Sequence, residues 1–232
     1  MKRSKRYTAS KNQVQQKELF QAKDALSLLQ DIAKGETSKA KFDESVDIAI
    51  NLNLKAKHTV RDTFILPHTM ETSEKKILVF AKGEKADEAE KAGAAFVGEK
   101  DLIEKIQGGW MDFDVAIATP DVMKDVGKLG PVLGRKGLMP NPKTGTVTFD
   151  IKNAIDEFKK GKVEFRADKT GIIHLKVGKV SMSQDQIFEN AKTLYGEVLK
   201  KKPTDLKGEY VRSVAFSTTM GPGLKIVHHS LN

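Results

Sequence analysis

Hydrophobic and polar residues alternate in two stretches that lie far apart in the chain. In the stretch ESVDIAINLNLK the apolar side chains are Val46, Ile48, Ile50, Leu52 and Leu54. In the stretch YVRSVAFST, Val214, Phe216 and Thr218 alternate with smaller residues. Because successive side chains of a strand point to opposite faces, both stretches predict β-strands with one buried face.

A third stretch, KVEFRADKTGIIHLKV, predicts a hairpin whose turn lies at residues 168–171. Its apolar residues alternate inward, and its polar face has Lys162, Glu164, Arg166, His174 and Lys176, with Lys169 and Thr170 at the tip. The stretch DQIFENAKTLYGEVLKKK that follows has the spacing of an amphipathic helix. Together these elements predict an α+β domain that is built from both ends of the chain.

The middle of the chain has a different pattern, in which short apolar runs alternate with helical stretches. KKILVFA, AAFVG and DVAIAT are strand candidates, KGEKADEAEKAGA and EKDLIEKIQ are helix candidates, and residues 150–160 are a further helix. This alternation is typical of a small parallel sheet with helices on its faces. We therefore predict an inserted α/β three-layer domain at 71–161 and a discontinuous α+β domain at 1–70 and 162–232. The crossings near 66–68 and 160–161 are candidate hinges.

Charge follows the same division. The 232 residues have a formal net charge of +9, yet residues 71–161 contain 15 Lys and Arg against 16 Asp and Glu. The flanks contain 13 against 8 in 1–70 and 12 against 7 in 162–232. A lysine-rich surface kept for solubility would not leave the middle neutral. The division predicts a polyanionic partner, such as a nucleic acid, for the flanks.

Several classes of protein are excluded or disfavoured. The chain has no cysteine, which excludes disulfides and cysteine-based zinc sites and fits a reducing cytoplasm. It has no apolar run of membrane-spanning length, so no membrane association is expected. The glycines after KKILVFA do not form a dinucleotide fingerprint, and GKLGPVLGRKG lacks the Gly-Lys-Ser/Thr ending of a P-loop. We expect no cofactor and no metal. A nucleotide-dependent enzyme built on the middle sheet is the alternative hypothesis.

The stretch FSTTMGPGLKI, near the C-terminus, has two interpretations. Ser213, Ala215, Ser217 and Thr219 share one side of the preceding strand, and such small, mostly hydroxylic residues suit close contact with RNA ribose and phosphate. Alternatively, TTMGPG is only a type II turn with Pro222 at its second position and Gly223 at its third. Gly221 precedes a proline, so we expect an extended backbone there that other residues also adopt, at little cost to the fold.

Four motifs together resemble the bacterial ribosomal protein L-one family: GWMDFDVAIATPDVM, KLGPVLGRKGLMPNPKTGTV, EFRADKTGIIH and STTMGPG, within a likeness from residue 5 to 229. The resemblance implies a discontinuous RNA-binding domain with an inserted Rossmann-like domain, and no enzymatic activity. It implies a cytoplasmic, ribosome-associated protein, monomeric when free, that binds large-subunit ribosomal RNA. It also implies a mobile stalk that assists release of deacylated exit-site tRNA, and repression of the protein's own operon messenger RNA.

The RNA contacts of the family carry over by position. They are Lys41, Phe42, Ser45, Arg166, Asp168, Lys169, Thr170, His174, Ser213, Ser217, Thr219, Met220 and Gly221. Family members often have threonine where this chain has Ser45 and Ser217, and serine keeps the hydroxyl. Phe42 also fits a core position. The role of loop 130–145 stays open, because its basic residues suit contact with RNA while its glycines and prolines suit a purely rigid loop.

Overall fold

The chain is divided into two units, which we describe separately. A computed structural model describes residues 4–14, 19–35, 40–55, 58–70 and 75–231. The first unit comprises Met1–Met70 and Glu164–Asn232, and the second comprises Glu71–Val163. This division differs by two residues at one boundary from the division expected from the sequence. The first unit has 24 Lys and Arg against 15 Asp and Glu, and the second has 16 of each, so the net positive charge lies entirely in the first.

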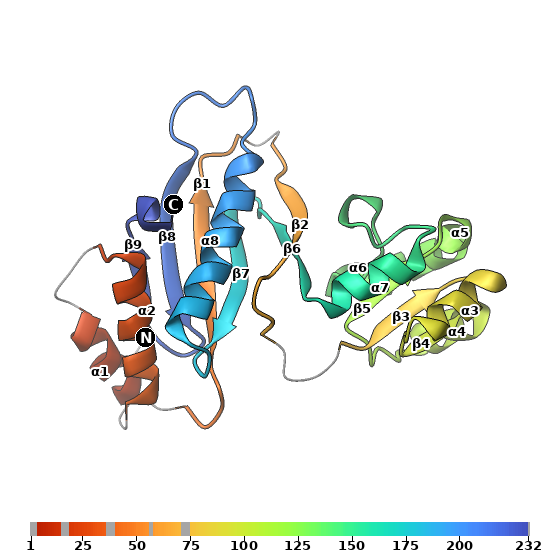
Figure 1. The fold of residues 1–232 in the computed structure, drawn as a ribbon, viewed down its shortest axis with the longest axis horizontal. Helices are drawn as coiled ribbons and strands as arrows, with labels where there is room; N and C mark the ends of the chain where they lie inside the picture. Colours follow the sequence, from red (N-terminus) through yellow and green to blue (C-terminus); the bar gives the residue numbers. More distant parts are fainter. Residues whose placement is uncertain (1–3, 15–18, 36–39, 56–57, 71–74, 232) are drawn as a thin grey trace. The chain divides into compact units, whose positions relative to one another are not determined.

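An antiparallel four-stranded sheet forms the centre of the first unit (Figure 1). Its strands, in order, are β7 (Ile172–Lys179), β1 (Ser45–Leu52), β8 (Val211–Thr218) and β9 (Gly223–Ile226). Val46, Ile48, Ile50 and Leu52 are buried, and the residues between them are partly exposed. Val214, Phe216 and Thr218 of β8 are buried in the same alternating way. The predictions of two half-buried strands are confirmed.

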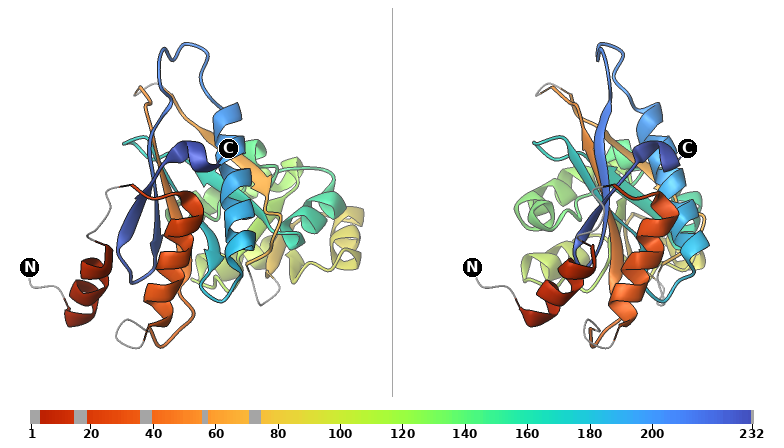
Figure 2. Two further views of the ribbon diagram at one scale, coloured as in Figure 1. Left: turned by 60° about the vertical axis from the view of Figure 1, so that its left-hand side comes forward. Right: turned by 90° about the vertical axis from the view of Figure 1, so that its left-hand side faces the viewer.

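Two helices cover the buried face of this sheet, as the right-hand view of Figure 2 shows. Helix α8 (Gln184–Lys200) packs on β7, and α2 (Ala22–Lys34) packs on β8 and β9. Helix α8 was predicted, and Ser183 and Gln186 form a capping box at its start. Helix α2 was not predicted, although Leu26, Leu29 and Ala33 have helical spacing. The side of the sheet away from α2 and α8 keeps its side chains partly exposed.

The predicted hairpin is right in its turn and wrong in its pairing. The Asp168 N–H donates to the Ile172 carbonyl at 2.9 Å, which closes the turn. However, β6 (Lys162–Arg166) pairs with β2 (Arg61–Ile65) in a separate two-stranded sheet, and Ala167, the residue after β6, forms a single bridge to Ile173 of β7. Instead, β7 pairs with β1 along most of its length. Neighbouring strands in the sequence therefore end in different sheets.

The second unit contains a parallel sheet, as predicted, with β3 (Ile77–Phe80) between β4 (Phe96–Gly98) and β5 (Val115–Ala118). Two hydrophobic cores lie on its two faces. One core includes residues of α3 (Glu84–Lys91) and α7 (Ile151–Lys159). The other includes residues of α4 (Lys100–Gln107), α5 (Met123–Val126) and α6 (Gly130–Lys136). The 3-10 turns η1 (Pro120–Val122), η2 (Gly127–Leu129) and η3 (Pro142–Thr144) lie in the part of the chain between β5 and α7.

The stretch 130–145 is only partly a loop, which corrects the sequence-based interpretation. Residues 130–136 form α6, and Leu133 is buried together with Leu129 one turn earlier. Gly137 ends the helix in the left-handed conformation, with φ +72°. The basic residues of the stretch, Arg135, Lys136 and Lys143, are exposed.

Short N- and C-terminal elements complete the first unit: α1 (Lys5–Val14) and the 3-10 turn η4 (His228–Leu231). The Phe20 N–H donates to the Lys225 carbonyl at 3.0 Å, so the N-terminal part of the chain also pairs with β9. Within the described ranges, no helix combines the length and the apolar character that crossing a bilayer requires.

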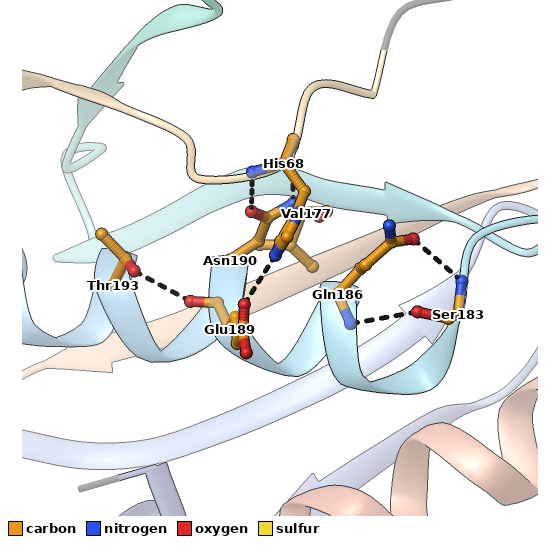
Figure 3. A network of polar contacts seen from close by, with 7 residues as sticks. All are labelled: His68, Val177, Ser183, Gln186, Glu189, Asn190 and Thr193. Atoms are coloured by element: carbon orange, nitrogen blue, oxygen red, sulfur yellow. Dashed lines mark hydrogen bonds and ion pairs between the residues drawn. The ribbon is translucent and has the colours of Figure 1, made fainter.

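The chain segment that leads out of the first unit is held by one buried side chain (Figure 3). The Asn190 side chain of α8 is fully buried, and its carbonyl accepts from the His68 N–H at 3.0 Å. Its amide donates to the carbonyls of His68 at 3.0 Å and Val177 at 2.9 Å. His68 Nε2 also lies 2.6 Å from the Glu189 carboxylate. The backbone at His68 is therefore tied to α8 and, through Asn190, to β7.

Candidate RNA-binding interface

The exposed side of the four-stranded sheet has small residues at its centre and cations at its edges. We call this side the open face. Cross-strand register places its residues in two rows, His174–Ala49–Ala215–Lys225 and Lys176–Asp47–Ser217–Gly223. Ser213 lies opposite Asn51 beside these rows. Alanine and serine let a partner approach the sheet closely, and the flanking cations suit an anionic partner. The predicted small, hydroxylic side of β8 is confirmed.

Asp47 is a carboxylate within the open face. Burial raises the pKa of Asp47, and the nearby charges of Lys176 and His174 oppose that rise. Lys176 lies directly opposite Asp47 on β7, so these two charges largely balance each other. His174 and Lys225, at the ends of the other row, have no acidic residue between them. Lys225 is therefore a cation of the open face with no acidic residue in its own row.

One group of the predicted contacts lies where β1 begins and β8 ends. The Ser45 N–H donates to Thr219 Oγ1 at 3.0 Å, and the Thr219 N–H donates to the Ser45 carbonyl at 3.1 Å. The Met220 N–H donates to the buried Glu44 carboxylate at 3.0 Å. The Thr219 hydroxyl therefore helps to join the two strands. Glu44, which sequence reasoning did not identify, positions the backbone of Met220.

Two large apolar side chains of this group are exposed. Phe42 is 55% exposed and Met220 is 48% exposed. The core interpretation of Phe42 is therefore wrong. An exposed phenylalanine and methionine beside a polar face are suited to stack on or pack against bases. Lys41, the remaining predicted residue of this group, is exposed next to Phe42.

The other group of predicted contacts lies at the opposite end of β1, on the turn before β7. Asp168 Oδ1 accepts from the N–H groups of Thr170 and Ile172, each at 2.8 Å, and from the Thr170 hydroxyl at 2.7 Å. The hydrogen bonds from Ile172 and Thr170 lower the pKa of Asp168. Asp168 thus organises the turn that exposes Arg166, Lys169 and Thr170.

Ten of the thirteen predicted residues thus form two groups at opposite ends of β1, and the other three, His174, Ser213 and Ser217, lie on the open face between the groups. Ser45 is paired with Lys179 at one end of β7, and Asn51 is paired with Ile172 at the other. At about 3.3 Å per residue, the two ends are roughly 20 Å apart. All thirteen belong to the first unit. Lys225 also borders the open face but was missed, because its place depends on the pairing of β9 with β8.

Comparison with known proteins gives the family. The model of the ribosomal protein L1p/L10e family matches residues 34–222. The chain belongs to this family. It is 54% identical to the "Large ribosomal subunit protein uL1" of Borrelia duttonii, over 97% of this chain and 98% of that protein. It is 59% identical to the protein of the same name from Treponema denticola, over 84% of this chain and 85% of that protein.

Family membership decides between the two classes of function that the sequence left open. The family is one of structural ribosomal proteins, so the chain is not an enzyme, and its place is on the ribosome in the cytoplasm. The hypothesis of a nucleotide-dependent enzyme is therefore set aside. Within the described ranges, no three His, Cys, Asp or Glu side chains are grouped as a metal site would require.

The STTMGPG segment, at the end of the family match, differs from both expectations about its glycines. Neither Gly221 nor Gly223 has a positive φ, so Gly223 does not occupy the third position of a type II turn. A Cβ built on Gly221 would lie 2.3 Å from Thr218 Oγ1, whereas one on Gly223 would meet nothing within 4 Å. The expectation that Gly221 tolerates larger residues is therefore wrong. The limit is contact with Thr218, not backbone conformation.

Replacing Gly221 by alanine should lower the free energy of unfolding by about 1–3 kcal/mol, because the buried Thr218 must move to admit the new methyl group. Gly223→Ala is the matched control and should change the stability by no more than about 0.5 kcal/mol. Urea unfolding followed by circular dichroism measures both. Equal stability of the two variants would contradict the assigned packing.

Proposed function

We propose that this protein is a structural component of the large ribosomal subunit and that its first unit binds large-subunit ribosomal RNA. The observation that carries the proposal is the open face, with small residues at its centre and cations at its edges, on the unit that holds all of the net positive charge. Its relatives bear the name of a large-subunit protein. The two groups of predicted contacts extend this face at both ends of β1 and give it the length to follow an RNA backbone.

We further propose the finer roles that the family resemblance implies. The protein, a monomer when free, forms the mobile stalk that assists release of deacylated tRNA from the exit site. It also represses translation of its own operon messenger RNA. A messenger that binds the open face competes directly with ribosomal RNA for it. Repression would then begin only when the protein exceeds its ribosomal sites. No cofactor takes part in either role.

Lys169→Ala tests the proposed RNA contact at the turn. Each phosphate that a protein neutralises contributes about 0.7–0.9 to the slope of log affinity against log salt. We expect this variant to bind transcribed large-subunit ribosomal RNA about 3- to 10-fold more weakly and to have a slope that is shallower by about that amount. Filter binding across a potassium chloride series measures both quantities.

The matched control for Lys169→Ala is Lys192→Ala, which removes the same charge from the exposed side of α8, the helix that covers the other face of the sheet. It should leave the slope unchanged. If the two variants behave alike, only the total charge matters and the turn is not a contact. If the wild-type protein shows no salt-dependent binding to this RNA, the proposed function is wrong.

A further inference from the structure

A basic pocket lies beside the Asp168 turn, between two loops of the first unit. Its volume is about 560 Å³. One wall comes from residues 54, 55, 58 and 59, which follow β1, and the other from residues 166–169 and 171. Lys55, on the first wall, is exposed and faces the same pocket as Arg166 and Lys169 on the second. Neither sequence reasoning nor the family resemblance singled out Lys55.

Backbone contacts hold the two walls together. The Leu52 N–H donates to the Gly171 carbonyl at 2.9 Å, and the Ala167 N–H donates to the Val60 carbonyl at 2.9 Å. Gly171 has φ +83°, and a Cβ there would lie 2.9 Å from the Leu52 carbonyl oxygen. Only glycine permits this close approach. The pocket is thus bounded by two loops that are fixed to each other at both ends.

His58 positions Lys55. Its side chain is only 9% exposed, and its Nδ1 accepts from the Lys55 N–H at 3.3 Å. Its Nε2 lies 2.9 Å from the Asp205 carboxylate, in the connection between α8 and β8. The His58 N–H also donates to the Lys55 carbonyl at 2.9 Å. A nearly buried histidine therefore holds the backbone of Lys55 at the rim of the pocket.

The cations of the pocket lack ionic partners, unlike their neighbours. No carboxylate lies within ion-pair distance of Lys55, Arg166 or Lys169 in the part of the chain that the structure describes. By contrast, Arg61 is paired with Glu164, and Lys201 is paired with Asp62. Asp168 also lines the pocket, but its Oδ1 already accepts three hydrogen bonds from its own turn. Three positive charges therefore face the pocket against one negative charge.

We propose that this pocket is a phosphate-binding site for the backbone of the bound RNA, with Lys55 as a contact additional to those of the Asp168 turn. The inference rests on the proposed function, since it assigns a second wall to the same RNA site. Three unpaired cations around one concave surface favour a phosphodiester over a base, because no exposed aromatic ring lines the pocket. The site extends the interface beyond the open face, towards the connection between β1 and β2.

The test compares Lys55→Ala, Lys55→Arg and Lys192→Ala with the wild-type protein, using transcribed large-subunit ribosomal RNA and a potassium chloride series. Lys55→Ala should bind about 3- to 10-fold more weakly, with a log–log salt slope that is shallower by about 0.7–0.9. Lys55→Arg should keep most of the affinity and the slope, because it keeps the charge. Lys192→Ala, on the far side of the sheet, should resemble the wild type. Circular dichroism checks that each variant is folded.

The outcomes separate the two proposals. If the wild type and Lys169→Ala behave as expected but Lys55→Ala binds like the wild type, the RNA site is retained and the phosphate pocket is wrong. If Lys55→Ala and Lys192→Ala lose the same affinity, the effect is one of net charge, and the pocket is again wrong. If the wild type does not bind this RNA, the proposed function itself fails.

Discussion

Asn190→Leu should lower the free energy of unfolding by about 3–5 kcal/mol. Leucine has the same branched arrangement of side-chain heavy atoms as asparagine but makes no hydrogen bonds, so the carbonyls of His68 and Val177 and the N–H of His68 lose their partner in the interior. Each buried polar group left without a partner costs about 1–3 kcal/mol. Urea unfolding, followed through the far-ultraviolet signal, measures the loss.

His68→Ala is the control for this prediction. It keeps both backbone hydrogen bonds to Asn190 and removes only the contact between the imidazole and Glu189, whose side chain is largely exposed. An exposed polar contact of this kind contributes about 0–1 kcal/mol. If His68→Ala destabilises as much as Asn190→Leu, the imidazole and not the buried amide holds this segment, and the assigned role of Asn190 is wrong.

Local pattern was enough to predict the half-buried strands and the amphipathic helix. Ile48 and Phe216 alternate with polar or small neighbours, and a sheet with only one buried face requires that alternation. The parallel sheet of the second unit could be predicted equally well, because its four-residue central strand is buried throughout and is therefore a continuous apolar run in the sequence. In each case the burial of a residue depends mainly on the periodicity of its own segment.

The hydrophobic pattern of the sequence could not predict which distant strands pair with each other. The strands on either side of the Asp168 turn look like a hairpin, yet β7 pairs with β1, more than 100 residues earlier in the chain. A run of alternating residues specifies a face but not a partner. The helix at Gly130–Lys136 was missed for a different reason, because its glycines and proline gave it the composition of a loop.

The candidate site shows the same limit. The serines of β8 and the cations of the Asp168 turn could be identified from the sequence, because they lie on a predicted strand and at a predicted hairpin tip. Glu44 and Lys55 could not be identified in this way. Glu44 accepts a part-buried hydrogen bond from the Met220 N–H, and the proposed role of Lys55 depends on its contact with His58 at the pocket. The family resemblance supplied Phe42 and Met220 by position, and only the structure shows that both are exposed.

Separating the two units should give the largest change in RNA affinity. A chain in which residue 70 is joined to residue 164 by a short Gly/Ser bridge should bind large-subunit ribosomal RNA within about threefold of the full chain. Residues 71–163 alone should bind at least about 1,000-fold more weakly, a difference of about 4 kcal/mol. The reason is that the first unit holds the open face, the Asp168 turn and all of the net charge, whereas the second has none.

The joined first unit should also fold, because its core does not depend on the insert. Its four-stranded sheet and both covering helices lie within it, and Phe64 on β2 and Phe165 on β6 meet with ring centroids 5.9 Å apart, close to the two ends that the bridge connects. Circular dichroism melting checks folding, and filter binding at fixed salt gives the affinities. If both pieces are folded and residues 71–163 bind the RNA as tightly as the joined first unit, the assignment of RNA binding to the first unit is wrong.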